Sequence, residues 1–426
     1  MILGKYSFGL GDRFGHQGKA QLEAVMKARR EGIEITPVWN KSNREHKIIG
    51  TRPAHVRREA DDAVAACGWG GAYFVDADHI GLGNVDGFIE ASDFFTLDVA
   101  DFIAKKSVQT DVDAFVEKHS KYIGSLAVAG IDRSFEISKE LIRSAAGKYL
   151  LAVKEAGRIY RHIEAAKPQG PLSGGRGSFV TEVSMDETDE PQTPVEMLFI
   201  LAAIADEGIP AQTVAPKFSG RFNKGVDYVG EVEGFAKEFE ETIAVVAFAV
   251  GQFALPAQLK LSVHSGSDKF SIYGPINKAL KKFDAGVHIK TAGTTWLEEL
   301  IGLATAGGDG LAIAKHVYEQ ALKRIDELCG PYETVIDIDK GKLPMAGEVE
   351  RWDGRRFAAA LRHDRTCEQY NPNFRQLLHV GYKVAAEMGR TYLDALKEYA
   401  DVIGQNVTEN IYERHIKPIL AEDSVA

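Results

Sequence analysis

The sequence has 426 residues, of which 45% are hydrophobic and 26% are charged, so it is long enough to bury a large core without disulfide bonds. Asp and Glu number 61 against 51 Lys and Arg, and the resulting formal charge of −10 argues against a nucleic-acid partner. The three cysteines, Cys67, Cys329 and Cys367, form no CxxC pair, which favours a reduced, cytoplasmic compartment. Residues 1–15 lack an export signal and no apolar window is long enough to cross a bilayer, so we expect neither secretion nor a membrane partner.

Short apolar or β-branched runs recur along the chain, and most are followed by polar and glycine residues and then by a helical pattern. Residues 18–30 and 232–250 are rich in helix-forming residues with apolar positions at helical spacing. The candidate strands are residues 6–10, 35–39, 72–75, 179–183, 212–215, 259–263, 286–289 and 376–380. Eight strands alternating with helices predict the α/β class and a (β/α)8 TIM-type barrel.

Two intervals between the predicted strands are too long for a simple helical crossover. They cover about residues 80–177 and 297–373, and we interpret them as helical insertions after strands 3 and 7 of a single domain spanning residues 1–426. The first contains a helical stretch at 135–166 and a turn with Gly174, Gly175 and Gly177. Because insertions that follow strands lie at the C-terminal face of such a barrel, we expect both to roof the active site.

The first strand ends in a glycine-rich segment, Gly9-Leu10-Gly11-Asp12-Arg13-Phe14-Gly15. Its spacing matches neither the dinucleotide-binding pattern nor the P-loop pattern. A tight turn that presents Asp12 and Arg13 is the simpler interpretation.

The third predicted strand ends in Val75-Asp76-Ala77-Asp78-His79. Strand alternation directs Asp76 and Asp78 to the same side. A carboxylate beside an imidazole is suited to act as a base next to a metal ligand, although Asp78 is also a reasonable helix N-cap.

Glu182 lies inside the apolar run of the next predicted strand. An ionised side chain there is costly unless it is paired, binds a metal or stays protonated. A buried structural ion pair is the alternative without a catalytic role.

Two histidines, His264 and His288, lie near the ends of the sixth and seventh predicted strands. Each alone is as readily a buried core residue. Together with His79, they form a set of three imidazoles that predicts one divalent cation, of the group Zn, Ni, Co, Mn or Fe. Further basic or nearly basic side chains at the same barrel mouth suit an anionic substrate; these are Lys217, Arg221, Lys224 and His379.

At these positions the sequence resembles the tagaturonate epimerase family, also called tagaturonate/fructuronate epimerases. The resemblance follows the chain in order from near the N-terminus to the predicted eighth strand. It rests on SFGLGDR at 7–13, ADH at 77–79, EVSMDET at 182–188, KGVDY at 224–228, HSGSDKFS at 264–271, HIKTAGT at 288–294 and RQLLHV at 375–380. The segment around His264 is the most specific of these.

The resemblance implies a metal-dependent isomerase of hexuronate catabolism that interconverts D-tagaturonate and D-fructuronate, a pair of small ketohexuronates. It implies Asp78 as proton acceptor, Glu182 as proton donor, and His79, His264 and His288 as metal ligands. From the motifs and the strand ends we expect a substrate-binding set comprising Lys224, Lys269, Ser267, Asp268 and Arg13.

The two sugars differ at a hydroxyl-bearing carbon that is β to the ketone, so its proton is not directly acidified. Retro-aldol cleavage and re-formation of a carbon–carbon bond therefore fits the reaction, with a metal stabilising the enediolate. The alternatives are abstraction of another proton, a metal-dependent aldolase or isomerase of another ketose, and a non-catalytic accessory barrel subunit. The sequence leaves the metal, the physiological sugar and the oligomeric state open.

Overall fold

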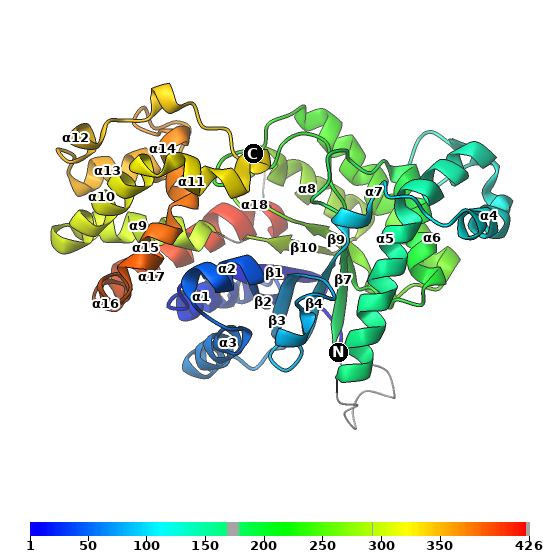
Figure 1. Cartoon of the computed structure of the whole chain (residues 1–426), viewed down its shortest axis with the longest axis horizontal. Helices are drawn as coiled ribbons and strands as arrows, with labels where there is room; N and C mark the ends of the chain where they lie inside the picture. The colour runs from blue at the N-terminus through cyan, green and yellow to red at the C-terminus, as the bar shows by residue number, and fades with distance from the viewer. Residues whose placement is uncertain (168–178, 292, 423–426) are drawn as a thin grey trace.

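The computed structural model describes residues 1–167, 179–291 and 293–422. Eight parallel strands close into a barrel in the order β1-β10-β9-β8-β7-β4-β3-β2 (Figure 1). The strands are β1 (Tyr6–Gly11), β2 (Ile35–Ser42), β3 (Phe74–Ile80), β4 (Phe94–Asp98), β7 (Val180–Ser184), β8 (Thr213–Ala215), β9 (Lys260–Val263) and β10 (Val287–Lys290). The predicted (β/α)8 barrel is confirmed.

Seven of the eight predicted strands belong to the barrel, but the predicted strand at 376–380 is wrong. Those residues lie in helix α14 (Pro372–Val380), which begins after the N-cap Asn371 with proline at its first position. The missing strand is β4, whose sequence FFTLD is short and buried on both faces and therefore lacks alternation. It follows β3 through a connection that contains only a short 3-10 helix, η1 (Val85–Gly87).

Helices surround the barrel and also extend it. Those packed around the strands are α1 (Gly18–Arg30), α3 (Pro53–Cys67), α5 (Lys139–Ala166), α6 (Pro194–Asp206), α7 (Val232–Phe253), α8 (Phe270–Phe283) and α9 (Thr294–Ala306). The short helix α2 (Asn43–Ile49) follows β2, and α4 (Gln109–Lys118) with the hairpin β5 (Gly124–Leu126) and β6 (Phe135–Ile137) follows β4. In the described part of the chain, no helix is long and apolar enough to cross a membrane.

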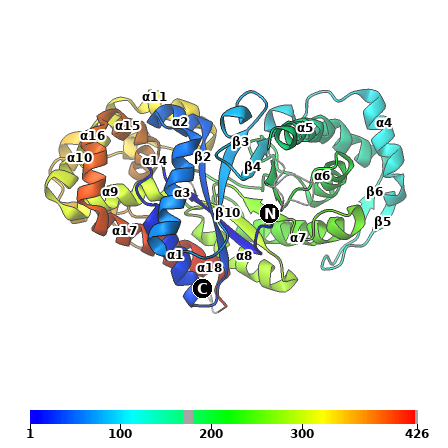
Figure 2. The same cartoon turned by 90° about the horizontal axis from the view of Figure 1, so that it is seen from below.

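Beyond α9, the described segment contains helices and no strands. It comprises α10 (Gly308–Lys323), α11 (Ile325–Cys329), η4 (Gly330–Val335), η5 (Lys340–Lys342), α12 (Ala346–Val349), α13 (Gly354–Leu361), α14, α15 (Tyr382–Met388), α16 (Arg390–Glu398), α17 (Ala400–Glu409), the π-helix η6 (Asn410–Ile416) and α18 (Lys417–Leu420). Most of these helices lie on one side of the strands, and α4 to α7 lie on the other (Figures 1 and 2).

Because β4 was missed and 376–380 is helical, the positions predicted for the two insertions are wrong. The additional segments follow the fourth and eighth barrel strands, β4 and β10, instead of the third and seventh. The helical stretch predicted at 135–166 is β6 followed by α5. The predicted turn with Gly174, Gly175 and Gly177 lies outside the described residues.

A buried ion pair connects the helical C-terminal segment to the barrel. The Arg375 guanidinium in α14, which is 0% exposed, donates to Asp268 Oδ1 at 2.9 Å and to the Leu361 carbonyl at 2.8 Å. Burial alone would raise the pKa of Asp268, but Arg375 and then His363 hold it well below its usual value. The loop between β9 and α8, which contains Asp268, is therefore fixed by a residue more than a hundred positions later in the chain.

Replacing this arginine should destabilise the whole protein. Arg375→Met leaves the Asp268 carboxylate buried without its main counter-charge, and we expect a loss of about 3–5 kcal/mol in unfolding free energy. Thermal and denaturant unfolding provide the measurement. The double variant Arg375→Met/Asp268→Asn should lose less than the single variant, and Arg143→Met, which removes an exposed ion pair with Asp113, should have little effect.

Candidate active site

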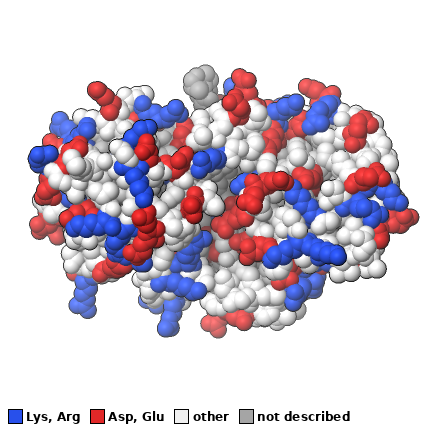
Figure 3. Space-filling model, turned by 45° about the horizontal axis from the view of Figure 1, so that its top comes forward, with Lys and Arg blue, Asp and Glu red and all other residues white. Residues whose placement is uncertain are grey.

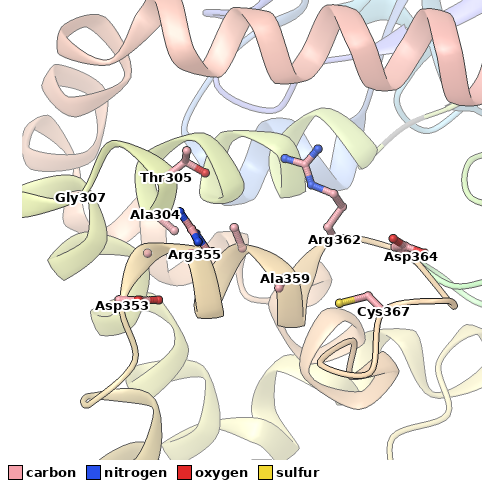
Figure 4. Close-up of a pocket in the computed structure, with 11 residues that line it drawn as sticks. Ala304, Thr305, Gly307, Asp353, Arg355, Ala359, Arg362, Asp364 and Cys367 are labelled. Atoms are coloured by element: carbon pink, nitrogen blue, oxygen red, sulfur yellow. The ribbon is translucent and has the colours of Figure 1, made fainter.

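Two of the cavities in the described part of the structure are of similar size, so their chemistry distinguishes them. One has a volume of about 820 Å³ and lies between α9 and α13, where its wall includes Thr305, Arg355, Arg362 and Cys367 (Figure 4). The other has a volume of about 850 Å³ and lies at the C-terminal ends of the barrel strands. Active sites of this fold form at that end, so the second cavity is the candidate site. On the face of the molecule that Figure 3 presents, acidic side chains are prominent near the middle.

The floor of this cavity is an ammonium group surrounded by acidic side chains. Lys290 Nζ, from β10, lies 2.7 Å from Asp78, 2.8 Å from Asp76 and 3.1 Å from Glu182. It also donates to the Thr96 hydroxyl at 2.6 Å. Burial favours the neutral amine, but the three carboxylates outweigh it and raise the pKa of Lys290 well above its usual value.

The same contacts set the charge of the carboxyl groups. Burial tends to raise the pKa of Asp78, but Lys290 and then His79 lower it to about 2, so Asp78 is ionised. For Asp76, burial prevails over Lys290 and raises the pKa to about 7. Asp76 and Asp78 both reach Lys290, which confirms that strand alternation directs them to one side.

His79 faces the cavity because the strand is irregular at this point. In a regular strand it would point away from the side occupied by Asp78. The pairing of β3 with β4 shifts register between Ala77 and Ile80, and His79 adopts a φ of 52°. The bulge therefore turns two consecutive side chains, Asp78 and His79, towards the same cavity.

Two of the histidines that line the cavity, His79 and His264, each have a carboxylate behind them. Asp98 Oδ2 lies 3.1 Å from His79 Nδ1, and Glu182 Oε1 lies 2.7 Å from His264 Nε2. The other nitrogen of His264, Nδ1, is buried without a hydrogen bond of good geometry, although Asp186 Oδ1 lies 3.0 Å away. Such carboxylate–histidine pairs orient imidazoles towards metal ions.

These side chains fit a divalent cation. One ligand atom each from His79, Asp186 and His264 lies within 4.8 Å of the others, and a second group is formed by His79, Asp98 and Glu187. Imidazole nitrogens with a carboxylate oxygen suit the predicted metals, Zn, Ni, Co, Mn or Fe. His264 Nδ1 supports this interpretation, because it and Asp186 Oδ1 lie 3.0 Å apart without a hydrogen bond of good geometry, and a metal would bind both atoms.

The structure does not bring the predicted third ligand, His288, into either group. Its Nδ1 lies 2.9 Å from the Ser7 hydroxyl, and its ring packs against Phe94 at 5.3 Å between centroids. Burial lowers the pKa of His288 to about 3, so the ring is neutral. In the first group, Asp186 is the third potential ligand, where the sequence analysis expected His288.

Glu182 also differs from its expected position. It is 0% exposed, and the described residues that line the cavity do not include it. His264, Lys290 and the Thr213 hydroxyl cover its two oxygens. Although burial tends to raise the pKa of Glu182, Lys290 and His264 lower it well below its usual value, so this carboxyl group is ionised.

Three of the predicted substrate-binding residues lie outside the described cavity wall: Ser267, Asp268 and Lys269. Lys269 Nζ donates to three backbone carbonyls, those of Asn223, Val226 and Ser267, at 2.7 to 2.9 Å. Together with the Asp268–Arg375 pair, these bonds fix the β9–α8 loop. The predicted contact of these residues with substrate is therefore not supported by their positions.

The other two predicted substrate-binding residues, Arg13 and Lys224, do line the cavity. Arg13 is already engaged, because it pairs with Glu45 at 3.1 Å, donates to the His379 carbonyl and lies over the Tyr382 ring. The ammonium of Lys224 instead donates to the Ser265 hydroxyl at 2.7 Å, and no ion pair to it occurs in the described part of the chain.

Of the other basic side chains predicted at the barrel mouth, two are present as cations in the cavity wall. Lys217 and Arg221 line the cavity, but burial, followed by Arg13 and Lys224, lowers the pKa of His379 well below its usual value, so His379 is not a cation.

From the segment after β10, Pro331, Tyr332, Thr334 and Val335 form part of the wall. Among the described residues, none from 99–167 does, so only the second additional segment roofs the site.

Comparison with known proteins agrees with this architecture. A family model described as tagaturonate epimerase matches residues 2–421. The chain belongs to the tagaturonate epimerase family. It is 26% identical over 429 residues to the tagaturonate/fructuronate epimerase of Thermotoga maritima, covering 96% of this chain and 80% of the relative.

Solved structures of the same family share the fold. The native fructuronate-tagaturonate epimerase of Cohnella laeviribosi superposes with a TM-score of 0.77 at 22% identity, and a glycerol complex gives 0.78 at 21%. Each comparison covers 98% of this chain and 82% of the other. As a member of the tagaturonate epimerase family, the chain is an epimerase and therefore an isomerase.

Sequence analysis of this epimerase assigned no role to Lys290, Asp98 or Asp186. A signal existed for Lys290, because it lies two residues after His288 in a strand and must share its side of the sheet. Asp186 lies inside the segment EVSMDET that carries the family resemblance. Asp98 offered no signal, because strand β4 itself was missed.

Metal content distinguishes the two possible ligand sets. Asp186→Asn removes an anionic donor from the His79–Asp186–His264 group, so we expect metal affinity to fall at least tenfold, as elemental analysis after dialysis would measure. His288→Asn should keep its metal, and so should Glu190→Gln, a control for an exposed carboxylate. Full metal content in Asp186→Asn with loss in His288→Asn would favour the three-histidine set.

Proposed function

We propose that this chain is a divalent-metal-dependent epimerase that interconverts D-tagaturonate and D-fructuronate. The observation that carries the proposal is the cavity floor, where the ionised Asp78 lies beside the His79–Asp186–His264 group. A base next to a metal site is what cleavage and re-formation of a bond next to a ketone requires. The family match over residues 2–421 and the names of the relatives support the substrate class.

The reaction proceeds as a retro-aldol cleavage followed by aldol addition. A base removes the proton from the hydroxyl group β to the ketone, the bond between the α and β carbons breaks, and the electron pair enters an enediolate. The resulting aldehyde turns over before the bond forms again, and a proton returns to its oxygen. When bound, a divalent cation supplies the Lewis acidity that stabilises the enediolate oxygens.

Asp78 acts as the base in this scheme. It is ionised, it lines the cavity, and its position beside Lys290 is fixed. Glu182, predicted as proton donor, lies under the cavity floor and is ionised, so we assign it instead to orienting His264. His79 and His264 would hold the metal together with Asp186, and Asp98 orients His79.

The substrate carboxylate binds to Lys224. Among the cationic side chains that line the cavity, Arg13 is paired with Glu45 and Arg221 with Asp337. Lys217, Arg44 and Lys224 have no ion pair in the described structure, and of these Lys224 is the one bonded to the strand-end segment that carries His264, through the Ser265 hydroxyl. Its charge is not balanced by a carboxylate, so it is suited to receive one.

A single domain of residues 1–426 and a cytoplasmic location complete the proposal. One continuous hydrophobic core includes Leu10 of β1, Leu300 of α9 and Leu377 of α14, which supports a single domain. The three cysteines are free, which supports a reducing compartment.

The activity itself is tested by incubating the purified protein with D-tagaturonate or D-fructuronate and each of Zn²⁺, Ni²⁺, Co²⁺, Mn²⁺ and Fe²⁺. Carbon NMR should show each sugar forming from the other, and a chelator should abolish the conversion. Accumulation of two shorter fragments would indicate an aldolase, and no conversion with any of the metals would contradict the proposal.

Removing the base should abolish turnover without loss of metal. Asp78→Asn keeps the size of the side chain but not its basicity, so we expect kcat to fall by roughly 10²-fold or more. Metal content and melting temperature should stay near those of the wild type. A variant with wild-type kcat would exclude Asp78 as the base.

Removing the free cation should affect charged substrates selectively. Lys224→Met should lower kcat/KM for the ketohexuronates by roughly 10 to 150-fold, the range expected for a charge-assisted hydrogen bond. Conversion of neutral D-tagatose or D-fructose should change far less. Arg221→Met, which removes a cation already paired with Asp337, is the matched control. Equal losses on charged and neutral sugars would assign carboxylate binding to another residue.

A further inference from the structure

We propose that Lys290 is a positioning residue that keeps the Asp78 carboxylate out of the metal coordination sphere and thereby free to act as the base. This inference rests on the proposed function for the role of Asp78. Its structural part, the restraint of one carboxylate by one ammonium group, is tested below without substrate.

Asp78 lies close enough to the metal-binding group to need such a restraint. Its Oδ1 atom is 3.9 Å from His79 Nε2, the nitrogen left free by the His79–Asp98 bond. Carboxylate oxygens are ready ligands for every metal that the group suits. An Asp78 bound to the metal would lose the basicity that proton abstraction requires, because the cation would hold its electron pair.

The Lys290 ammonium competes for the same oxygen. Lys290 Nζ lies 2.7 Å from Asp78 Oδ1, and a protonated amine donates hydrogen bonds but cannot bind a metal. The carboxylate atom nearest to His79 is therefore the one that the lysine holds.

Lys290 is itself fixed from three other directions. Asp76 on β3, Thr96 on β4 and Glu182 on β7 all lie within 3.1 Å of its ammonium, and its side chain is only 5% exposed. A lysine with these partners cannot move away with Asp78, so it acts as a fixed anchor. Without it, three carboxylates would face one another with no cation between them.

Gly9 provides independent support for this role. A Cβ atom at Gly9 would lie 3.1 Å from both Cα and Cγ of Lys290, closer than side chains normally approach. Gly9 has no positive φ, so the glycine is required for space and not for backbone conformation. The absence of a side chain at Gly9 leaves space beside β1 for the aliphatic part of the Lys290 side chain. This accounts for a glycine in a segment that matches no phosphate-binding pattern.

The test uses the full-length protein loaded with Co²⁺, whose visible absorption reports the number and type of ligands. In Lys290→Met we expect one bound Co²⁺ per chain with a changed, weaker d–d spectrum, because Asp78 enters the coordination sphere. The double variant Lys290→Met/Asp78→Ala should recover the wild-type spectrum. An unchanged spectrum in the single variant, or a change that persists in the double variant, would overturn the proposal.

Activity supplies the second measurement. Lys290→Met should lower kcat by roughly 10²-fold, the scale of losing a general base, while KM changes by only a few-fold. Lys260→Met is the matched control, since Lys260 is another buried barrel lysine but bonds to the Gly4 carbonyl at the opposite end of the strands. It should keep the wild-type spectrum and kcat.

Two additional experiments cover the cases in which Lys290→Met does not fold or the wild-type protein shows no activity. If Lys290→Met unfolds below the assay temperature, Lys290→Gln removes the charge but retains a donor, and the same spectral change is expected. If the wild-type protein converts neither hexuronate, the proposed function fails, but the Co²⁺ spectra still decide whether Lys290 restrains Asp78. Trapping of Lys290 by borohydride in the presence of a ketose would identify it as a Schiff-base nucleophile and overturn the proposal.

Discussion

The ammonium group of Lys290 is the interaction on which the centre of this barrel depends. Three carboxylates, from Asp76, Asp78 and Glu182, converge on it in a site almost closed to solvent. Buried carboxylates without a counter-charge would take up protons or be expelled towards water. A single cation thus allows strands β3 and β7 to carry acidic side chains on their inner faces and still pack into a closed ring. Strands β3 and β7 and strand β10, which carries Lys290, depend on one another for this reason.

Above this floor, orientation is provided by a second set of carboxylates. Asp98 holds His79 through Nδ1, and Glu182 holds His264 through Nε2, so the two imidazoles present different ring nitrogens to the space between them. Glu182 belongs to both layers, because it contacts Lys290 as well as His264. The metal-binding group and Asp78 are therefore connected through two buried side chains, Glu182 and Lys290.

The sequence predicted the barrel and the epimerase family, and the errors in the predicted elements have identifiable causes. Alternation located Asp76 and Asp78 correctly, because β3 is regular up to that point. The orientation of His79 depends on a bulge that the alternation of residues in the sequence does not predict. Strand β4 has no polar alternation, and 376–380 resembles a buried strand until the N-cap at Asn371 and the proline after it are considered.

Side-chain partners were harder to predict than strands. His288 lies on a barrel strand and is of a residue type that binds metals, but it is buried like a core residue. How deeply a strand residue is buried depends on the register of its strand in the barrel. Lys269 lies in a family motif, yet its charge is used to hold three carbonyls of its own loop. In both cases a motif gives the identity of a residue but not the direction in which its side chain points.

Part of the cavity wall comes from a different region of the chain than the cavity floor, namely from the helical segment after β10. The reacting groups come from β3, β9, β10 and the end of β7, whereas Pro331, Tyr332 and Val335 come from η4, about forty residues beyond the last strand. This part of the wall and the reacting groups are thus encoded in separate stretches of the chain. Exchanging the η4 region between relatives would therefore change this part of the wall without replacing any of the groups on the cavity floor, which makes the segment a practical place to recombine members of the family.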